Sequence, residues 1–145
     1  CDQVVWLDAT ERKWVEEMGG MNLYFVKGKG ADATIFTPKL TGTLLAGITR
    51  DSILTAAKDL GYKVEEGMIS TDDWRDGVSS GEITEIFACG TAAVISPVGQ
   101  AKSAMGTWVT GDGKPGEITM KIRNHMLAIQ HGTTADTHNW MKPVK

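Results

Sequence analysis

The chain has few cysteines and histidines and no long apolar run. Its two cysteines, Cys1 and Cys89, and its three histidines stand at spacings that form neither a disulfide framework nor a zinc-binding pattern. This usage favours a reducing compartment, so we expect a cytoplasmic protein without a metal site. No apolar run approaches the roughly 20 residues that cross a bilayer, and no signal-peptide pattern is present, so we expect no membrane contact.

Positive charge is also scarce. The 15 Lys and Arg residues against 18 Asp and Glu residues give a formal net charge of −3, and the lysines are scattered along the chain. Proteins that bind nucleic acid concentrate Lys and Arg on one face, so we expect no nucleic-acid partner. The hydrophobic share of 41% and the charged share of 23% exclude a disordered tail, a collagen-like repeat and a coiled coil.

Glycine, in contrast, is abundant. The 17 glycines among 145 residues exceed the usual share of about 7%, so many positions favour open backbone geometry or a close approach. The length predicts one domain that buries roughly 70% of the surface exposed in the unfolded chain. Because the chain starts at Cys1 without an initiator Met and runs straight into a strand-like segment, we expect a fragment of a longer protein.

The first third of the chain is rich in predicted strands. Apolar runs favour strands at 3–7, 14–15, 22–26 and 35–37, with an interruption at 16–20 and a loop at 28–33.

Residues 49–60 carry the first helical pattern. Thr49 is expected to be the N-cap, and Gly61 follows the last helical residue. Ile48 and Ile53 occupy the two positions of a hydrophobic staple. The apolar stripe consists of Ile53, Leu54, Ala57 and Leu60.

Two more helices are expected in the rest of the chain. One follows a cap at 70–73 and runs through 78, and the other spans 118–129 and ends near Gly132. Strands are expected at 62–69, 82–89, 92–98 and 107–109, with a loop at 111–116. Short strands interleaved with three helices predict a mixed α/β fold, more like one part of a larger sheet than a closed domain.

Three segments can carry chemistry, and each also has a purely structural interpretation. Gly47 before the helix start leaves backbone N–H groups free for an anion, although Thr49 can simply cap its own helix. Residues 89–93 form a small-residue turn that can hold a carboxylate or phosphate, or merely connect two strands. Glu16 and Glu17 on strand-like backbone point to opposite faces, so one of them can be directed inward beside Gly19 and Gly20. In the structural interpretation, both lie at the surface beside a turn.

In this order, several stretches resemble the carboxy-terminal part of the branched-chain amino-acid aminotransferases, pyridoxal-phosphate enzymes of fold type IV. The stretches are 1–9, 15–23, 47–52, 86–93 and 129–132, and the resemblance covers nearly the whole chain. It implies that residues 1–145 are the carboxy-terminal part of the cofactor-binding large domain, a sheet or pseudo-barrel packed with helices. The amino-terminal small domain would be absent, and a homodimer is expected.

The resemblance also implies roles for individual residues around pyridoxal 5'-phosphate. Glu17 would contact the pyridine nitrogen of the cofactor. The backbone N–H groups of Ile48 and Thr49, with the hydroxyl of Thr91, would bind its phosphate. The N–H groups of Thr91 and Ala92 would bind the substrate carboxylate, and Gly20 would border the substrate pocket.

By the same resemblance, the intact protein would exchange amino groups between L-leucine, L-isoleucine or L-valine and 2-oxoglutarate in amino-acid biosynthesis. The family's catalytic lysine stands before a Gly-Asn-Tyr stretch, which would lie upstream of Cys1. We therefore expect no catalytic residue in this chain and no activity from the chain alone. Ala93 and Ser96 stand where some relatives have a redox-active cysteine pair, so thiol regulation is not expected.

Three other functions remain open. The same ring chemistry serves D-amino-acid transaminases and aminodeoxychorismate lyases of this fold type. A non-catalytic anion-binding or assembly module is the third alternative.

Overall fold

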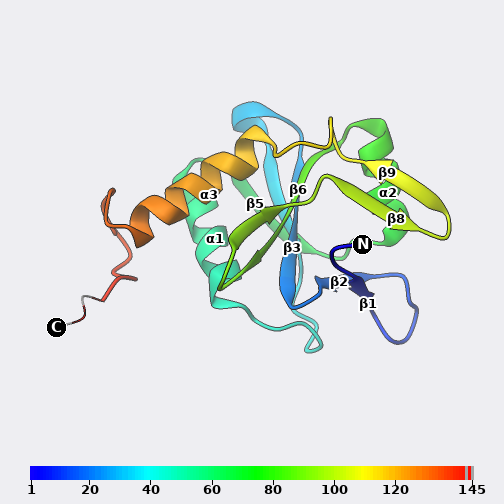
Figure 1. Cartoon of the computed structure of the whole chain (residues 1–145), viewed down its shortest axis with the longest axis horizontal. Coiled ribbons are helices and arrows are strands. Elements are labelled where there is room, and N and C mark those ends of the chain that lie inside the picture. The colour runs from blue at the N-terminus through cyan, green and yellow to red at the C-terminus, as the bar shows by residue number, and fades with distance from the viewer. Residues whose placement is uncertain (143, 145) are drawn as a thin grey trace.

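The computed structural model describes residues 1–142 and 144 of the chain (Figure 1). Within that part, strands, three helices and a short 3-10 helix alternate along the sequence. The elements are β1 (Val5–Leu7), β2 (Val15–Met18), β3 (Met21–Lys27), η1 (Gly30–Asp32), β4 (Thr34–Pro38), α1 (Ile48–Asp59), β5 (Lys63–Gly67), α2 (Thr71–Ser80), β6 (Ile83–Gly90), β7 (Val94–Pro97), β8 (Gln100–Ser103), β9 (Gly106–Val109) and α3 (Glu117–Gln130).

Strand β3 lies at the centre of the main sheet. Antiparallel β6 pairs with one edge of β3, from Asn22 opposite Cys89 to Lys27 opposite Ile83. Two strands share the other edge, since β2 pairs with the start of β3 and β4 pairs with its end. Where the two partners part, the hydroxyl of Thr37 donates to the carbonyl oxygen of Leu23 at 2.7 Å. Parallel β5 extends the sheet beyond β4, and antiparallel β7 extends it beyond β6.

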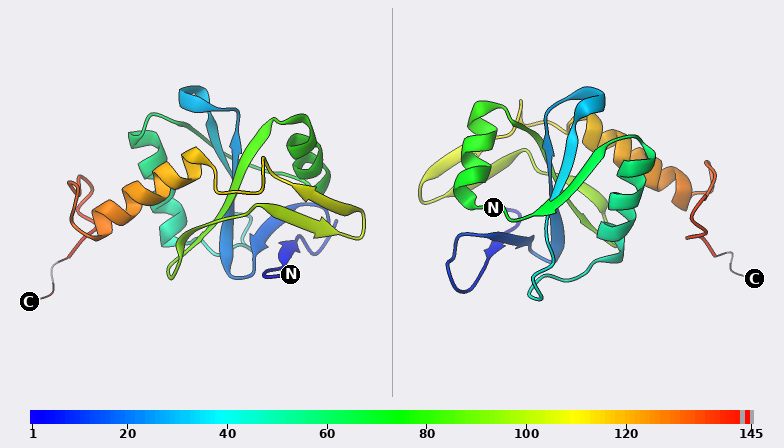
Figure 2. Two further views of the ribbon diagram at one scale, coloured as in Figure 1. Left: turned by 45° about the horizontal axis from the view of Figure 1, so that its top comes forward. Right: turned by 180° about the vertical axis from the view of Figure 1, so that it is seen from behind.

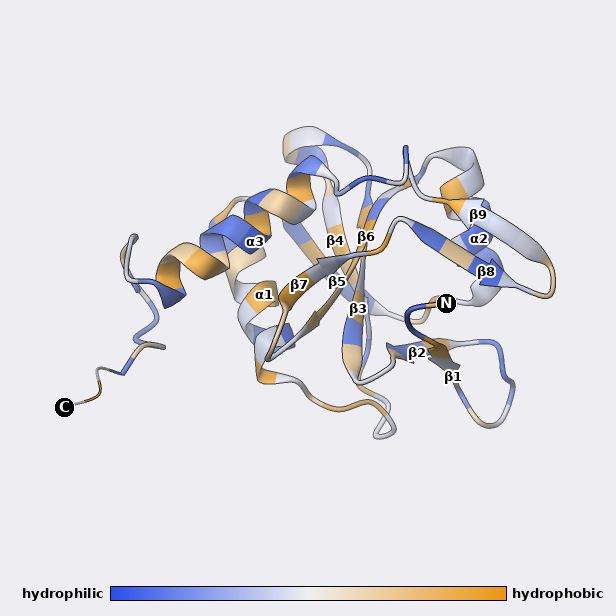
Figure 3. Ribbon diagram, in the orientation of Figure 1, coloured by the Kyte–Doolittle hydropathy of each residue, from blue (hydrophilic) through white to orange (hydrophobic). Residues whose placement is uncertain are grey.

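Other elements cover both faces of this sheet (Figures 1 and 2). Successive side chains of a strand point to opposite faces. Tyr24 and Val26 therefore pack with α1 and α3, whereas Leu23 and Phe25 pack with α2 and the β8–β9 hairpin. Figure 3 shows α3 as a helix on which apolar and polar residues alternate, as expected for a helix with one buried face. The predicted mixed fold with three helices is confirmed.

The body of α1 agrees with the predicted helix, but its start does not. The helix begins at Ile48 with Gly47 as N-cap, and no side chain caps it, so the prediction of Thr49 as N-cap is wrong. Ile48 is 84% exposed, so it forms no hydrophobic staple with buried Ile53. At the other end, Gly61 follows the helix with a φ of +89°, as predicted.

Two strand predictions also need correction. Residues 16–18 do not interrupt the second strand but belong to β2, because backbone pairing with β3 continues through Glu17 and Met18. Strand β8 was not expected, since its residues 100–103 are short and mostly polar, and only its pairing with β9 makes it a strand. The predicted cap of the second helix is confirmed, because Ser70 and Asp73 form a reciprocal capping box.

After α3 the chain returns to the end of α1. The Nε2 atom of His138 lies 2.6 Å from Oδ2 of Asp59, and the His138 ring stacks on Trp140 at 4.7 Å between centroids. Trp140 in turn packs against the cluster between the sheet and helices α1 and α3. These contacts fix the segment that follows α3.

Candidate functional site

One end of the sheet brings together the three segments singled out in the sequence. Glu17 is opposite Asn22, and Asn22 is opposite Cys89, so a single row crosses β2, β3 and β6. The turn after β6 and the start of α1 lie at the same end, in the lower part of Figure 1. We call this region, formed by 17–22, 45–50 and 89–93, the site edge.

Glu17 connects β2 to the segment that leads into α1. Its Oε1 atom accepts a hydrogen bond from the backbone N–H of Leu45 at 2.5 Å. The neighbouring Glu16 accepts one from the hydroxyl of Thr43 at 2.6 Å. Both carboxylates are therefore partly exposed and hold the same loop, rather than one lying inward and the other in water.

The start of α1 is open towards an anion. Among the described residues, none accepts a hydrogen bond from the backbone N–H of Ile48 or Thr49. Such free groups, with the positive end of the helix dipole behind them, attract phosphate or carboxylate. The approach to the helix is fixed by Asn22, whose Nδ2 donates to the carbonyl oxygen of Leu45 at 3.0 Å. A Cβ atom at Gly47 would lie 2.4 Å from the Oδ1 atom of Asn22, so any larger residue here would force Asn22 or the loop to shift.

The turn between β6 and β7 offers a second set of free donors. Thr91 and Ala92 are exposed, and no described residue accepts a hydrogen bond from the backbone N–H of either one. The turn is strained, because Val94 has a φ of +59°, a conformation that is unusual for a β-branched residue. Close to it, a Cβ atom on Gly90 would lie 3.3 Å from Cγ of Met21.

Gly20 lies in the turn between β2 and β3, at the same end of the sheet. A Cβ atom there would meet no other atom within 4 Å, so the space beside it is open. Its neighbour Gly19 has the restrictive geometry, with a φ of +60° and a Cβ position only 2.1 Å from Oε1 of Gln3. The conformation of the turn therefore requires glycine at position 19, whereas Gly20 borders open space at the end of the sheet.

The sequence analysis missed three further residues here: Asn22 and Arg50 within the site edge, and Tyr24 next to it on β3. Each lies inside a segment whose sequence pattern is that of an ordinary strand or helix. The one sequence signal for such a residue is a polar side chain at a position where the pattern predicts burial. Arg50 is 4% exposed, and its Nη2 atom donates to the carbonyl oxygen of Pro38 at 2.9 Å. The hydroxyl of Tyr24 donates to the carbonyl oxygen of Arg50 at 2.7 Å.

Cys89 is not a nucleophile in this arrangement. It is buried, and burial raises the pKa of its thiol to about 12, so it stays protonated near neutral pH. Burial likewise raises the pKa of Tyr24 far above its usual value. Cys89 within the site edge and Tyr24 next to it are therefore structural.

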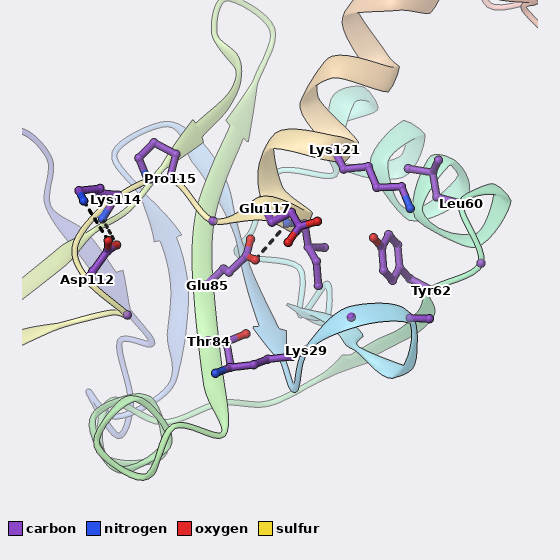
Figure 4. A pocket seen from close by; sticks show the side chains of 16 residues that line it. Lys29, Leu60, Tyr62, Thr84, Glu85, Asp112, Lys114, Pro115, Glu117 and Lys121 are labelled. Atoms are coloured by element: carbon purple, nitrogen blue, oxygen red, sulfur yellow. Dashed lines mark hydrogen bonds and ion pairs between the residues drawn. The ribbon is translucent and has the colours of Figure 1, made fainter.

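A hollow of about 530 Å³ lies at the opposite end of the sheet (Figure 4). Lys29, Tyr62, Glu85 and Lys121 are among its lining residues, and none of the predicted site residues is. Glu85, one of the three carboxylates that line the hollow, accepts hydrogen bonds from the backbone N–H groups of Ile118 and Thr119 at 3.0 and 2.7 Å. This carboxylate therefore caps the start of α3.

Within 1–142 and 144, no three His, Cys, Asp or Glu side chains gather closely enough to hold a metal ion. In the same range, no helix has the length and apolarity needed to span a membrane.

Comparisons with known proteins agree on one family. The family model "Amino-transferase class IV" matches residues 1–101. The branched-chain-amino-acid aminotransferase of Mycolicibacterium smegmatis is 60% identical over 141 residues, which is 97% of this chain and 38% of that protein. The Mycobacterium tuberculosis protein of the same name is 56% identical over the same coverage. The chain thus spans 38% of the length of these relatives.

Solved structures give the same result. The T.th. branched-chain amino acid aminotransferase with pyridoxamine 5'-phosphate matches with a TM-score of 0.80 and 29% identity, over 100% of this chain and 42% of that one. The Escherichia coli enzyme matches with a TM-score of 0.76 and 33% identity, over 97% of this chain and 42% of that one.

Proposed function

We propose, because this chain belongs to the class IV aminotransferase family, that it forms the carboxy-terminal part of a cofactor-binding domain in a branched-chain amino-acid aminotransferase. The intact enzyme would transfer the amino group of L-leucine, L-isoleucine or L-valine to 2-oxoglutarate. The observation that carries the proposal is the meeting of Glu17, the start of α1 and the β6–β7 turn at the site edge. The high identity to enzymes of that name supports the substrate class.

The residues of the site edge fit pyridoxal 5'-phosphate. The free N–H groups of Ile48 and Thr49 at a helix start suit its phosphate, and the exposed hydroxyl of Thr91 supplies a further donor. The carboxylate of Glu17 suits a protonated ring nitrogen. When bound, the cofactor supplies an electron sink for the charge that develops as the substrate loses its α-proton.

The substrate would be oriented by the same turn. The N–H groups of Thr91 and Ala92 would donate to the α-carboxylate, which fixes the orientation of the amino acid before reaction. Gly20 would border the substrate, since no side chain fills the space beside it. In this arrangement Glu17 keeps the proton on the ring nitrogen, and the backbone donors hold the two anionic groups.

The proton transfer itself needs a base that this chain does not offer. In the family, the lysine bound to the cofactor stands before Gly-Asn-Tyr, and no lysine of residues 1–145 has that context. We therefore expect residues 1–145 alone to show neither transamination nor the absorbance of a lysine-bound cofactor. Turnover by the isolated chain would contradict the assignment of the base to a segment outside it.

The substrate class is tested on the protein encoded by the complete reading frame that contains this sequence. A panel of amino acids with 2-oxoglutarate should give the highest kcat/KM for L-leucine, L-isoleucine and L-valine. Preference for a D-amino acid would instead favour a D-amino-acid transaminase, and pyruvate release from aminodeoxychorismate would favour the lyase. A reading frame that starts at Cys1, with anion binding but no turnover, would favour the non-catalytic module.

A further inference from the structure

The first turn of α1 is held by long-range contacts rather than by a local cap. Its N-cap Gly47 offers no side chain, so the usual hydrogen bond from Ser, Thr, Asp or Asn is missing. Instead, both the backbone and the side chain of Arg50 form contacts with strands of the sheet. Its carbonyl oxygen accepts from the hydroxyl of Tyr24, and its guanidinium reaches β4 and β5.

The contacts of Arg50 tie the helix start to three strands. Tyr24 belongs to β3, and its ring stacks on Phe87 of β6 with 4.9 Å between centroids. The Nη2 atom of Arg50 donates to the carbonyl oxygen of Pro38 at the end of β4. The same atom forms an ion pair with Glu66 of β5, whose side chain is 45% exposed.

For helix stability alone, this placement of Arg50 is poor. A cation in the first turn opposes the helix dipole, which favours cations at the other end. Its Nε atom is also buried without a hydrogen-bond partner among the described residues, which costs free energy. Its guanidinium instead contacts the carbonyl oxygen of Pro38 and the carboxylate of Glu66, and these contacts hold the first turn against β4 and β5.

We infer that Arg50 and Tyr24 are positioning residues, which hold the first turn of α1 so that its N–H groups bind the phosphate of the ligand. This inference rests on the proposed function. Neither side chain needs to touch the ligand, because both act through the backbone of residues 48–50. Removing either contact loosens the turn and weakens binding of the phosphate group more than binding of the rest of the ligand.

The test compares two ligands that differ only in the phosphate: pyridoxal 5'-phosphate and pyridoxal. The protein encoded by the complete reading frame is used, and dissociation constants are measured by quenching of tryptophan fluorescence. In Tyr24→Phe, which keeps the stacked ring, affinity for pyridoxal 5'-phosphate should fall about fivefold, the loss expected for one hydrogen bond. Affinity for pyridoxal should stay unchanged.

Glu66→Gln removes the ionic partner of Arg50 at a half-exposed position and should fold normally. It should reduce affinity for pyridoxal 5'-phosphate about threefold to tenfold, again without an effect on pyridoxal. Tyr62→Phe is the matched control, because Tyr62 is a buried tyrosine at the far end of α1 and should leave both affinities unchanged.

Equal losses for both ligands, or no loss in Tyr24→Phe and Glu66→Gln, would overturn the inference and leave the proposed function intact. An unaltered protein that binds pyridoxal 5'-phosphate no better than pyridoxal would overturn both. Thermal unfolding of each variant identifies a general loss of structure, which would lower the two affinities together and so also count against a positioning role.

Discussion

At the scale of single residues, Glu85 links two elements that lie far apart in the sequence. It stands on β6, yet its carboxylate takes the place of a cap at the start of α3, where N-cap Gly116 has no side chain. A Cβ atom at residue 116 would lie 2.0 Å from Cδ of Glu85. Glycine at this position therefore follows from the carboxylate beside it.

Glu85→Ala should destabilise the protein by about 1–2 kcal/mol, since two N–H groups of α3 lose their acceptor. Urea unfolding followed by circular dichroism measures this loss. Glu82→Ala is a suitable control, because Glu82 is exposed and its side chain forms, among the described residues, only a 3.7 Å surface ion pair with Lys27, which should contribute little. If both variants lose the same stability, the capping role of Glu85 is wrong.

Asp8 should make the stability of the protein depend on pH in the acidic range. Its carboxylate accepts hydrogen bonds from four backbone N–H groups, and these, led by that of Glu11, lower its pKa from 3.8 to about 2. The unfolded chain takes up the proton first, so the stabilisation is complete above about pH 4 and is lost as the pH falls towards 2.

Asp8→Asn should therefore lower the unfolding midpoint at pH 7 and show a smaller further loss than the unaltered protein between pH 4 and about pH 2. Urea midpoints measured across that range provide the comparison. Asp32→Asn, at an exposed position of η1, should retain the full acid sensitivity of the unaltered protein. An unchanged acid profile in Asp8→Asn would show that other carboxyl groups govern this range.

At the scale of elements, periodicity predicted the interior of α1 but not its start. The stripe of α1 follows from its own sequence, because Ile53, Leu54 and Ala57 all face the sheet. Its first residue does not, since the start is set by Asn22 and Tyr24, which lie on β3. Glu17 was identified from its segment and its resemblance, but its contact with Leu45 depends on a loop that no local pattern describes. The roles proposed for Glu17, Ile48, Thr49, Thr91, Ala92 and Gly20 stay predictions.

Two glycines of the site edge should respond differently to alanine. Gly47→Ala places a methyl group against Asn22, so the loop before α1 must shift, with an expected loss of about 1–3 kcal/mol of stability. Gly20→Ala meets no neighbouring atom and should leave stability unchanged. Thermal denaturation compares the two variants. A larger loss in Gly20→Ala would contradict the description of both positions.

At the scale of the whole molecule, the strands at the sheet margins leave backbone groups unpaired. Strands β5 and β7 each pair with a single neighbour in the described part of the chain. Such edges favour association between copies. We therefore expect residues 1–145 to form a dimer or a larger species, with a sedimentation coefficient that rises with protein concentration. A concentration-independent monomer in analytical ultracentrifugation would contradict this expectation.

The central position of β3 has a consequence for the order in which the molecule forms. Its longest pairing is with β6, from Asn22 opposite Cys89 to Lys27 opposite Ile83. These partners are far apart in the sequence, so the pairing cannot form until β6 has been synthesised. Contacts between such distant residues slow folding, because a long loop must be closed first. During synthesis on the ribosome, β3 emerges well before its partner, with apolar side chains on both faces. This interval is the time at which the nascent chain is most exposed to aggregation and most in need of a chaperone.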